Sequence, residues 1–169
     1  MTKKMAQPEK KISKATRNYV FNLFSFLPFL FLLSTGIIVL RYHSGFDEKL
    51  PTLRLNGHQW LTIHQITALV IIPIIITHLM MHINWLKQLF TFKLKGNNSG
   101  MNLTQLIVFL MCALTALLAW WTFDGTKLAE VLREVHSKLG LLLIVFWGIH
   151  LYNYSRWLLN MTRKKLRGK

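Results

Sequence analysis

The stretch WLTIHQITALVIIPIIITHLMMHINW, residues 60–85, carries no lysine, arginine, aspartate or glutamate. The region free of these charged types is longer still, since it reaches from Arg54 to Lys87. A helix that crosses the apolar core of a bilayer, about 30 Å thick, needs about 20 residues at about 1.5 Å each. The stretch is therefore long and apolar enough to be a membrane-spanning helix.

Three further stretches are free of charged side chains. They lie between Arg17 and Arg41, between Lys95 and Asp124, and between Lys138 and Arg156. Together with the first stretch they indicate four membrane spans. We expect these spans at residues 19–40, 59–86, 103–123 and 135–158.

The sequence therefore predicts an all-α membrane protein. A four-transmembrane-helix bundle, built from two repeated helical hairpins, would occupy residues 18–158. It would lie between a basic tail at 1–17 and another at 159–169.

A turn signal, Asp124-Gly125-Thr126, separates the third and fourth expected spans. Threonine is a favoured helix N-cap, because its hydroxyl accepts a hydrogen bond from a free backbone N–H of the first turn. The sequence therefore predicts that Thr126 caps a short helix, Lys127 to Glu134, which continues into the fourth span.

Basic residues are unevenly divided among the connections. Six precede the first span, three lie between the second and third spans, and six lie from Arg156 onward, whereas the other two loops carry three and two. The positive-inside rule then predicts a multi-pass protein of the inner or plasma membrane with both termini in the cytoplasm. We expect the basic tails to contact anionic lipid head groups. The net charge of +15 could suggest nucleic-acid binding. The sequence shows no soluble domain with interleaved aromatic residues to accompany that charge, which argues against this function.

Cys112 is the chain's single cysteine and falls within the third expected span. Without a second cysteine, the chain cannot form an intrachain disulfide, an iron–sulfur site or the C-x-x-C-H attachment of a c-type haem. A haem bound to this chain is therefore expected to be non-covalent, and Cys112 itself is expected to be a packing residue.

An internal repeat relates the two halves of the chain. One constant shift places His64 on His136 and His78 on His150. The first and third spans match more weakly, under the slightly larger shift that places Asn22-Leu23 on Asn102-Leu103 and Thr35 on Thr115. The repeat predicts two helical hairpins of the same topology, related by a pseudo-twofold axis along the membrane normal. The second and fourth spans would then run parallel.

The two histidines within each repeat are separated by two heptads, both from His64 to His78 and from His136 to His150. Two heptads of α-helix turn by roughly 1400°, about 40° short of four full turns, so both side chains lie on one face. They are separated by about 21 Å along the axis, which places one histidine near each side of the membrane. Parallel helices bring His64 opposite His136 and His78 opposite His150. Facing histidines suit the two axial positions of a haem iron, so the sequence predicts two b-type haems held by these four side chains.

Two other uses of the histidines compete with haem ligation. A polar side chain inside a bundle is often an interhelical hydrogen-bonding group worth about 1 kcal/mol, but two pairs of equal spacing inside a repeat make this interpretation weaker. A zinc or copper transporter would normally add carboxylate or thiol ligands at the same depth. No aspartate or glutamate lies inside an expected span, and Cys112 stands alone.

Several further residues are candidates for a supporting role. His82 lies one turn beyond His78. It is a candidate partner for a haem propionate, or a candidate ligand in place of His78. Basic side chains at the two interfaces are candidate propionate partners, with plain head-group contact as the alternative: Arg41, Arg54 and Lys138 on the outer side, and Lys87 and Arg156 on the inner side. The small residues Thr35-Gly36 and Thr115-Ala116 would permit close approach of helices or of a porphyrin.

The segments 60–85 and 134–157 (EVHSKLGLLLIVFWGIHLYNYSRW) resemble the four-helix membrane cytochromes b. Within that group the chain is most similar to the flavinylation-associated cytochrome family, which shares the histidine spacing and the tryptophan that follows the second histidine by one heptad. The resemblance implies that His64 and His136 ligate an outer haem and His78 and His150 an inner one. It also implies electron exchange with quinones or with a redox protein, a flavoprotein or cytochrome, outside the cytoplasm.

The sequence thus favours a di-haem b-type cytochrome that carries electrons across the membrane, without a catalytic residue of its own. Two alternatives stay open. One is a haem-bearing membrane anchor subunit of a larger oxidoreductase. The other is a haem-free four-helix membrane protein, structural or metal-transporting.

Overall fold

A computed structural model describes residues 13–43, 52–91, 93 and 98–167 of the chain. Apart from an isolated β-bridge between Thr52 and Leu55, the described segments contain helices and no strands. The helices are α1 (Lys14–His43), α2 (Gly57–Met81), α3 (Ile83–Phe90), α4 (Ser99–Leu117), the π-helical segment η1 (Leu118–Thr122) and α5 (Lys127–Arg167).

Four helical stretches are long and apolar enough to cross a membrane: Lys14–Tyr42, Gly57–Met81, Ser99–Thr122 and Lys127–Arg167. Their outward surfaces are apolar, and Phe24 and Leu27 are 67% and 68% exposed. Apolar surface of this extent on a folded chain calls for lipid rather than water around it. The predicted all-α, four-helix membrane fold is confirmed.

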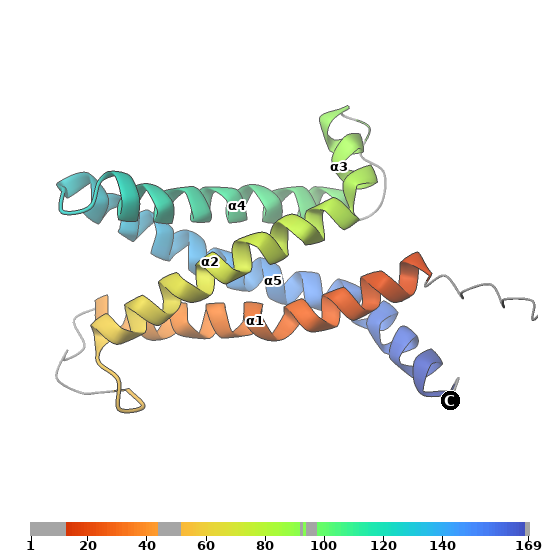
Figure 1. Cartoon of the computed structure of the whole chain (residues 1–169). Helices are drawn as coiled ribbons and strands as arrows, with labels where there is room; N and C mark the ends of the chain where they lie inside the picture. The colour runs from red at the N-terminus through yellow and green to blue at the C-terminus, as the bar shows by residue number, and fades with distance from the viewer. Residues whose placement is uncertain (1–12, 44–51, 92, 94–97, 168–169) are drawn as a thin grey trace, which may run out of the picture.

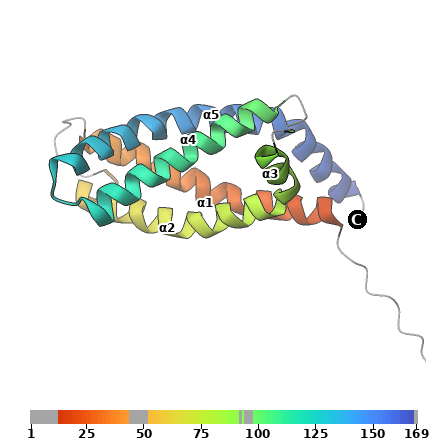
Figure 2. The ribbon, with the colours of Figure 1, turned by 90° about the horizontal axis from the view of Figure 1, so that it is seen from above.

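The helices form two hairpins. α1 packs against α2 and α4 packs against α5, and the two hairpins meet chiefly where α1 contacts α5. In Figures 1 and 2, α2 and α5 run in one direction along the bundle while α1 and α4 run in the other. The predicted parallel arrangement of the second and fourth spans is therefore confirmed.

The second span ends earlier than expected. The predicted helix extended to Leu86, but α2 ends at Met81 and the backbone of His82 leaves helical geometry, with φ −105° and ψ 26°. α3 then projects away from the bundle at its end (Figure 1). Its apolar residues Ile83, Leu86 and Phe90 share one face, so the segment suits the membrane interface better than a continued span. The 25 residues of α2 already reach across a bilayer core.

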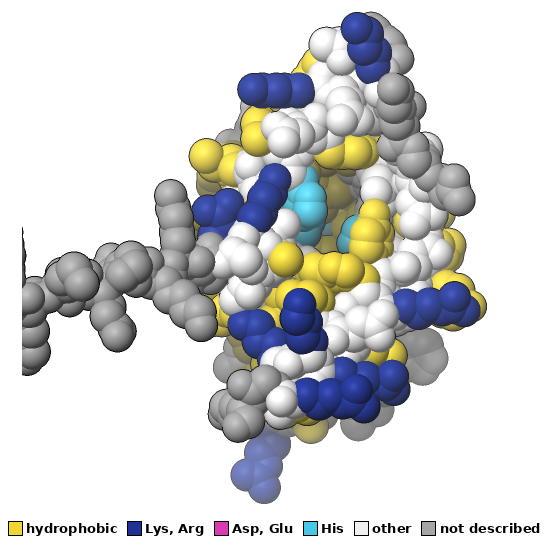
Figure 3. All heavy atoms as spheres, turned by 90° about the vertical axis from the view of Figure 1, so that its right-hand side faces the viewer, with side chains coloured by type: hydrophobic (Ala, Val, Ile, Leu, Met, Phe, Trp, Pro, Cys, Tyr) yellow, Lys and Arg dark blue, Asp and Glu magenta, His cyan; other side chains and the backbone are white. Residues whose placement is uncertain are grey.

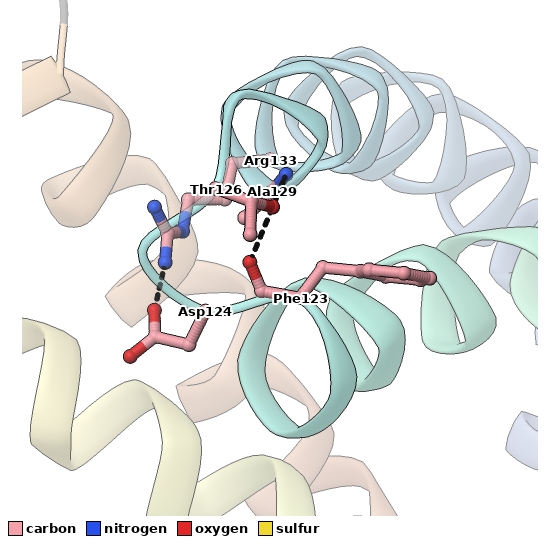
Figure 4. Close-up of polar contacts among 5 residues, drawn as sticks. All are labelled: Phe123, Asp124, Thr126, Ala129 and Arg133. Carbon is pink, nitrogen blue, oxygen red and sulfur yellow. Dashed lines mark hydrogen bonds and ion pairs between the residues drawn. The ribbon is translucent and has the colours of Figure 1, made fainter.

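The turn between α4 and α5 has the expected cap. The Ala129 N–H donates to the Thr126 hydroxyl at 3.2 Å, and that hydroxyl donates to the Phe123 carbonyl at 2.6 Å. Gly125 has φ +76°, a left-handed conformation that glycine adopts without steric cost. Asp124 and Arg133 form an ion pair across the turn (Figure 4). The predicted turn and N-cap are confirmed.

Helix α5 is longer than the expected fourth span. The predicted short helix over 127–134 is continuous with it, as expected, and the helix extends through Arg167. The described part of the C-terminal basic tail is therefore helical. At the other end of the chain α1 begins at Lys14, and residues 1–12 of the N-terminal tail lie outside the described residues.

Candidate functional site

His64 of α2 and His136 of α5 meet inside the bundle, as the repeat predicted. Their ring centroids are 6.2 Å apart and the ring planes form an angle of 63°. Both side chains are half-buried. Because α2 and α5 belong to different hairpins, this contact joins the two halves of the chain.

The ring of His64 is held by α1. Its Nδ1 lies 2.9 Å from the Thr35 hydroxyl, and that hydroxyl donates to the Leu32 carbonyl at 2.9 Å. A hydroxyl has a single proton, so Thr35 accepts the hydrogen bond from His64. His64 Nδ1 therefore carries the proton, and its Nε2 lone pair is available to a ligand.

The ring of His136 is held by α4 in a similar way. Its Nδ1 donates to the Cys112 carbonyl at 2.9 Å, because a carbonyl oxygen only accepts. The Cys112 thiol lies 3.4 Å from the same nitrogen, so this residue contacts the histidine as well as packing. As for His64, the Nε2 lone pair is available. Metal-ligating histidines almost always donate their second N–H to an acceptor of this kind.

The two hairpins have a threonine and a carbonyl at equivalent positions of α1 and α4. The shift that places Asn22 on Asn102 also carries Leu32 and Thr35 of α1 onto Cys112 and Thr115 of α4. Thr115 donates its hydroxyl to the Cys112 carbonyl at 3.0 Å, as Thr35 donates to the Leu32 carbonyl. His64 bonds to the threonine of its pair, whereas His136 bonds to the carbonyl of its pair. The sequence marked the two threonines as small residues and gave no sign of their hydrogen bonds.

Gly36 gives the His64 ring its space. A Cβ atom at this position would lie 3.2 Å from His64 Cε1 and 3.7 Å from Nδ1, and the shorter of these distances is tighter than nearly all real Cβ contacts. A side chain larger than hydrogen would therefore displace the ring. The expectation that Thr35-Gly36 permits a close approach is confirmed, and the approaching group is His64.

The ring separation in the outer pair agrees with that of two imidazoles bound to one metal ion. When two imidazoles bind one metal ion, each metal–nitrogen bond is about 2 Å long. Each of these nitrogens lies about 1.1 Å from the centre of its ring, whose bonds are about 1.35 Å. The two ring centroids are then about 6 Å apart. The observed distance is 6.2 Å. An angle between the ring planes is compatible with axial ligation, because each ring can rotate about the metal–nitrogen axis.

The inner histidines lie further apart. Among the described residues no ring contact joins His78 and His150, although they are near enough to interact electrostatically. Instead the His78 ring lies 4.9 Å from the ring of His82, and the His150 ring lies 4.6 Å from that of Tyr154. The predicted proximity of His82 to His78 is therefore observed. Burial and the positive charge of Lys14 lower the pKa of His82, so its ring is neutral at neutral pH.

The end of the bundle next to the inner histidines is hollowed. Figure 3 shows histidine side chains in the wall of this hollow and lysine and arginine side chains around it, with no aspartate or glutamate in view. Six buried polar atoms have no hydrogen-bond partner among the described residues, and all belong to this half of the bundle: Asn18 Oδ1, Asn22 Oδ1, Trp85 Nε1, Asn102 Oδ1, Gln105 Oε1 and His150 Nδ1. Buried polar groups without partners mark places where a ligand or water is expected.

The candidate propionate partners lie at the surface. Lys138 forms an ion pair with Glu134 at 2.7 Å on an exposed face of α5. Arg54 is exposed in the loop before α2, and Arg41 and Arg156 are exposed near the ends of α1 and α5. Among the described residues, Lys138, Arg54 and Arg156 form no hydrogen bond with the four histidines.

Comparison with protein-family models, curated proteins and solved structures found no match to this chain. Within the described residues no group of three or more histidine, cysteine, aspartate or glutamate side chains could hold a metal ion. A two-histidine pair with available Nε2 atoms is therefore the candidate site that the geometry supports.

Proposed function

We propose that this protein is a di-haem b-type cytochrome that carries electrons across a membrane. His64 and His136 would be the axial ligands of the outer haem, and His78 and His150 those of the inner haem. Electrons would be exchanged with quinone or quinol in the bilayer, or with a redox protein such as a flavoprotein or cytochrome. Both termini would lie in the cytoplasm, consistent with the basic residues at the α3 end of the bundle.

The His64–His136 pair carries the proposal. Its ring separation of 6.2 Å agrees with two imidazoles that share a metal, and the Nδ1 atoms of both rings are engaged by α1 and α4. Neither feature is needed for a simple interhelical hydrogen bond, in which one ring would donate to the other. The arrangement instead leaves both Nε2 lone pairs available.

A bound haem would supply reversible one-electron oxidation and reduction of its iron. The chain's own residues hold the ligands in place before the metal binds. Thr35 and the Cys112 carbonyl keep each imidazole in the Nδ1–H tautomer, and their hydrogen bonds make the ligands more basic.

The proposal is tested by a reduced-minus-oxidised absorption spectrum of the purified protein and by its haem content. We expect two b-type haems per chain, and one fewer in His64→Ala. The matched control is His58→Ala, because His58 lies in the first turn of the same helix, away from the contact with His136, and should leave both haems in place. A preparation without haem, grown with ample haem supply, would overturn the proposal.

A further inference from the structure

Asn102 of α4 lies beside the inner histidine of α5. Its side-chain Nδ2 donates to the Tyr154 hydroxyl at 3.0 Å, and the Tyr154 ring lies 4.6 Å from the ring of His150. Tyr154 follows His150 by one helical turn, and we refer to these three residues as the inner layer.

Two atoms of this layer are buried without a partner among the described residues. They are the side-chain oxygen of Asn102 and Nδ1 of His150. One is an acceptor, and the other is a donor in the tautomer that leaves Nε2 free for a ligand. An unsatisfied buried polar atom costs about 1–3 kcal/mol. A hydrogen bond between this donor and this acceptor would remove the cost for both atoms.

The outer layer shows what that pairing achieves. There α4 supplies the Cys112 carbonyl, which accepts the Nδ1–H of His136 on α5 at 2.9 Å. In the inner layer the same two helices face each other again, with His150 two heptads further along α5. Asn102 stands on α4 toward the same end of the bundle, and offers an oxygen from its side chain.

We propose that Asn102 is a positioning residue for the inner haem site. Its side-chain carbonyl accepts the Nδ1–H of His150, while Tyr154 orients the amide. Asn22 occupies the equivalent place in α1 within the repeat, also with an unpartnered buried oxygen among the described residues, and follows Phe21, whose ring contacts His78 at 6.4 Å. The inference concerns the inner site of the proposed cytochrome and rests on that function.

The test compares two substitutions of opposite chemical effect. Asn102→Leu removes the acceptor, whereas Asn102→Asp provides a stronger one. An acceptor on Nδ1–H makes the imidazole more basic and favours the oxidised iron. In a potentiometric titration we expect N102L to raise and N102D to lower the midpoint potential of the inner haem. The signal of the inner haem is identified as the one that is lost from the spectrum of His150→Ala. N102L should also weaken haem binding there by about 10–100-fold.

A matched control is Asn153→Leu. Asn153 is an exposed residue of α5 near His150, and its Nδ2 donates to the Met101 sulfur at 3.3 Å. We expect N153L to leave both potentials unchanged. The positioning role would be overturned if N102L and N102D changed the midpoint potential in the same direction, or if N153L changed it equally. A loss of packing alone would not shift the potential in opposite directions in N102L and N102D.

A second readout separates this inference from the proposed function. In protein with ¹⁵N-labelled histidine and no added haem, we expect His150 to show a protonated, hydrogen-bonded Nδ1 that loses this bond in N102L. If the wild type binds no haem but shows that bond, the cytochrome proposal fails and the pairing stands. If the Nδ1 signal of His150 is the same in wild type and N102L, the pairing is wrong.

Discussion

Replacing Thr35 by valine removes one hydroxyl from the outer site with almost no change in shape. Thr35 is 1% exposed and its hydroxyl is the 2.9 Å partner of His64 Nδ1. Loss of such an acceptor typically costs about 10–100-fold in metal affinity, which is about 1.4–2.8 kcal/mol at about 1.4 kcal/mol for each factor of ten. That range agrees with the cost of about 1–3 kcal/mol for a buried donor left unpaired. We therefore expect Thr35→Val to weaken haem binding at the outer site about 10–100-fold.

The repeat supplies the control for this substitution. Thr115 is 5% exposed and occupies the equivalent position in α4, but its hydroxyl donates to the Met111 and Cys112 carbonyls, at 2.9 and 3.0 Å, and not to a histidine. Thr115→Val therefore loses the same atom without taking the acceptor from His136. Both variants would be titrated with haem and followed by absorbance. Equal loss of outer-site affinity in the two variants, or none in Thr35→Val, would refute the assigned role of Thr35.

Three further outcomes are expected. Gly36→Ala should weaken haem binding at the outer site, because its Cβ would lie 3.2 Å from His64 Cε1; Gly140→Ala, with nothing within 4 Å of its Cβ, should leave haem content unchanged. Thr126→Ala should lower stability by about 1 kcal/mol through loss of the N-cap bond to Ala129, measured by thermal unfolding in detergent; an unchanged midpoint would contradict the cap. Reporter fusions at either terminus should both report a cytoplasmic location, and opposite locations would exclude an even number of spans.

The hydrogen bonds at the outer pair also bear on the alternative functions. A haem-free structural protein would need His64 and His136 only as polar contacts between hairpins. Their Nδ1 atoms are instead satisfied within each hairpin, by Thr35 and by the Cys112 carbonyl. Both Nε2 lone pairs are thereby left available, which is the physical reason to prefer a ligand between the two rings.

Part of this protein follows from composition and spacing alone. Charged side chains are too costly in the apolar core of a bilayer, so the four uncharged runs locate the four spans, all of which the structure contains. The two-heptad histidine spacing and the repeat relate side chains on regular helices, where position follows from sequence separation. The His64–His136 contact and the parallel course of α2 and α5 could therefore be predicted, and both are observed.

Other features depend on how the helices pack. The end of α2 at Met81 has no proline or glycine to announce it, and the sequence pattern placed that end at Leu86 instead. The acceptor for His136 is the backbone carbonyl of Cys112. Every residue has such a carbonyl, so no sequence pattern marks the one that meets an imidazole. Only the tertiary structure, by setting the register between neighbouring helices, decides which one does.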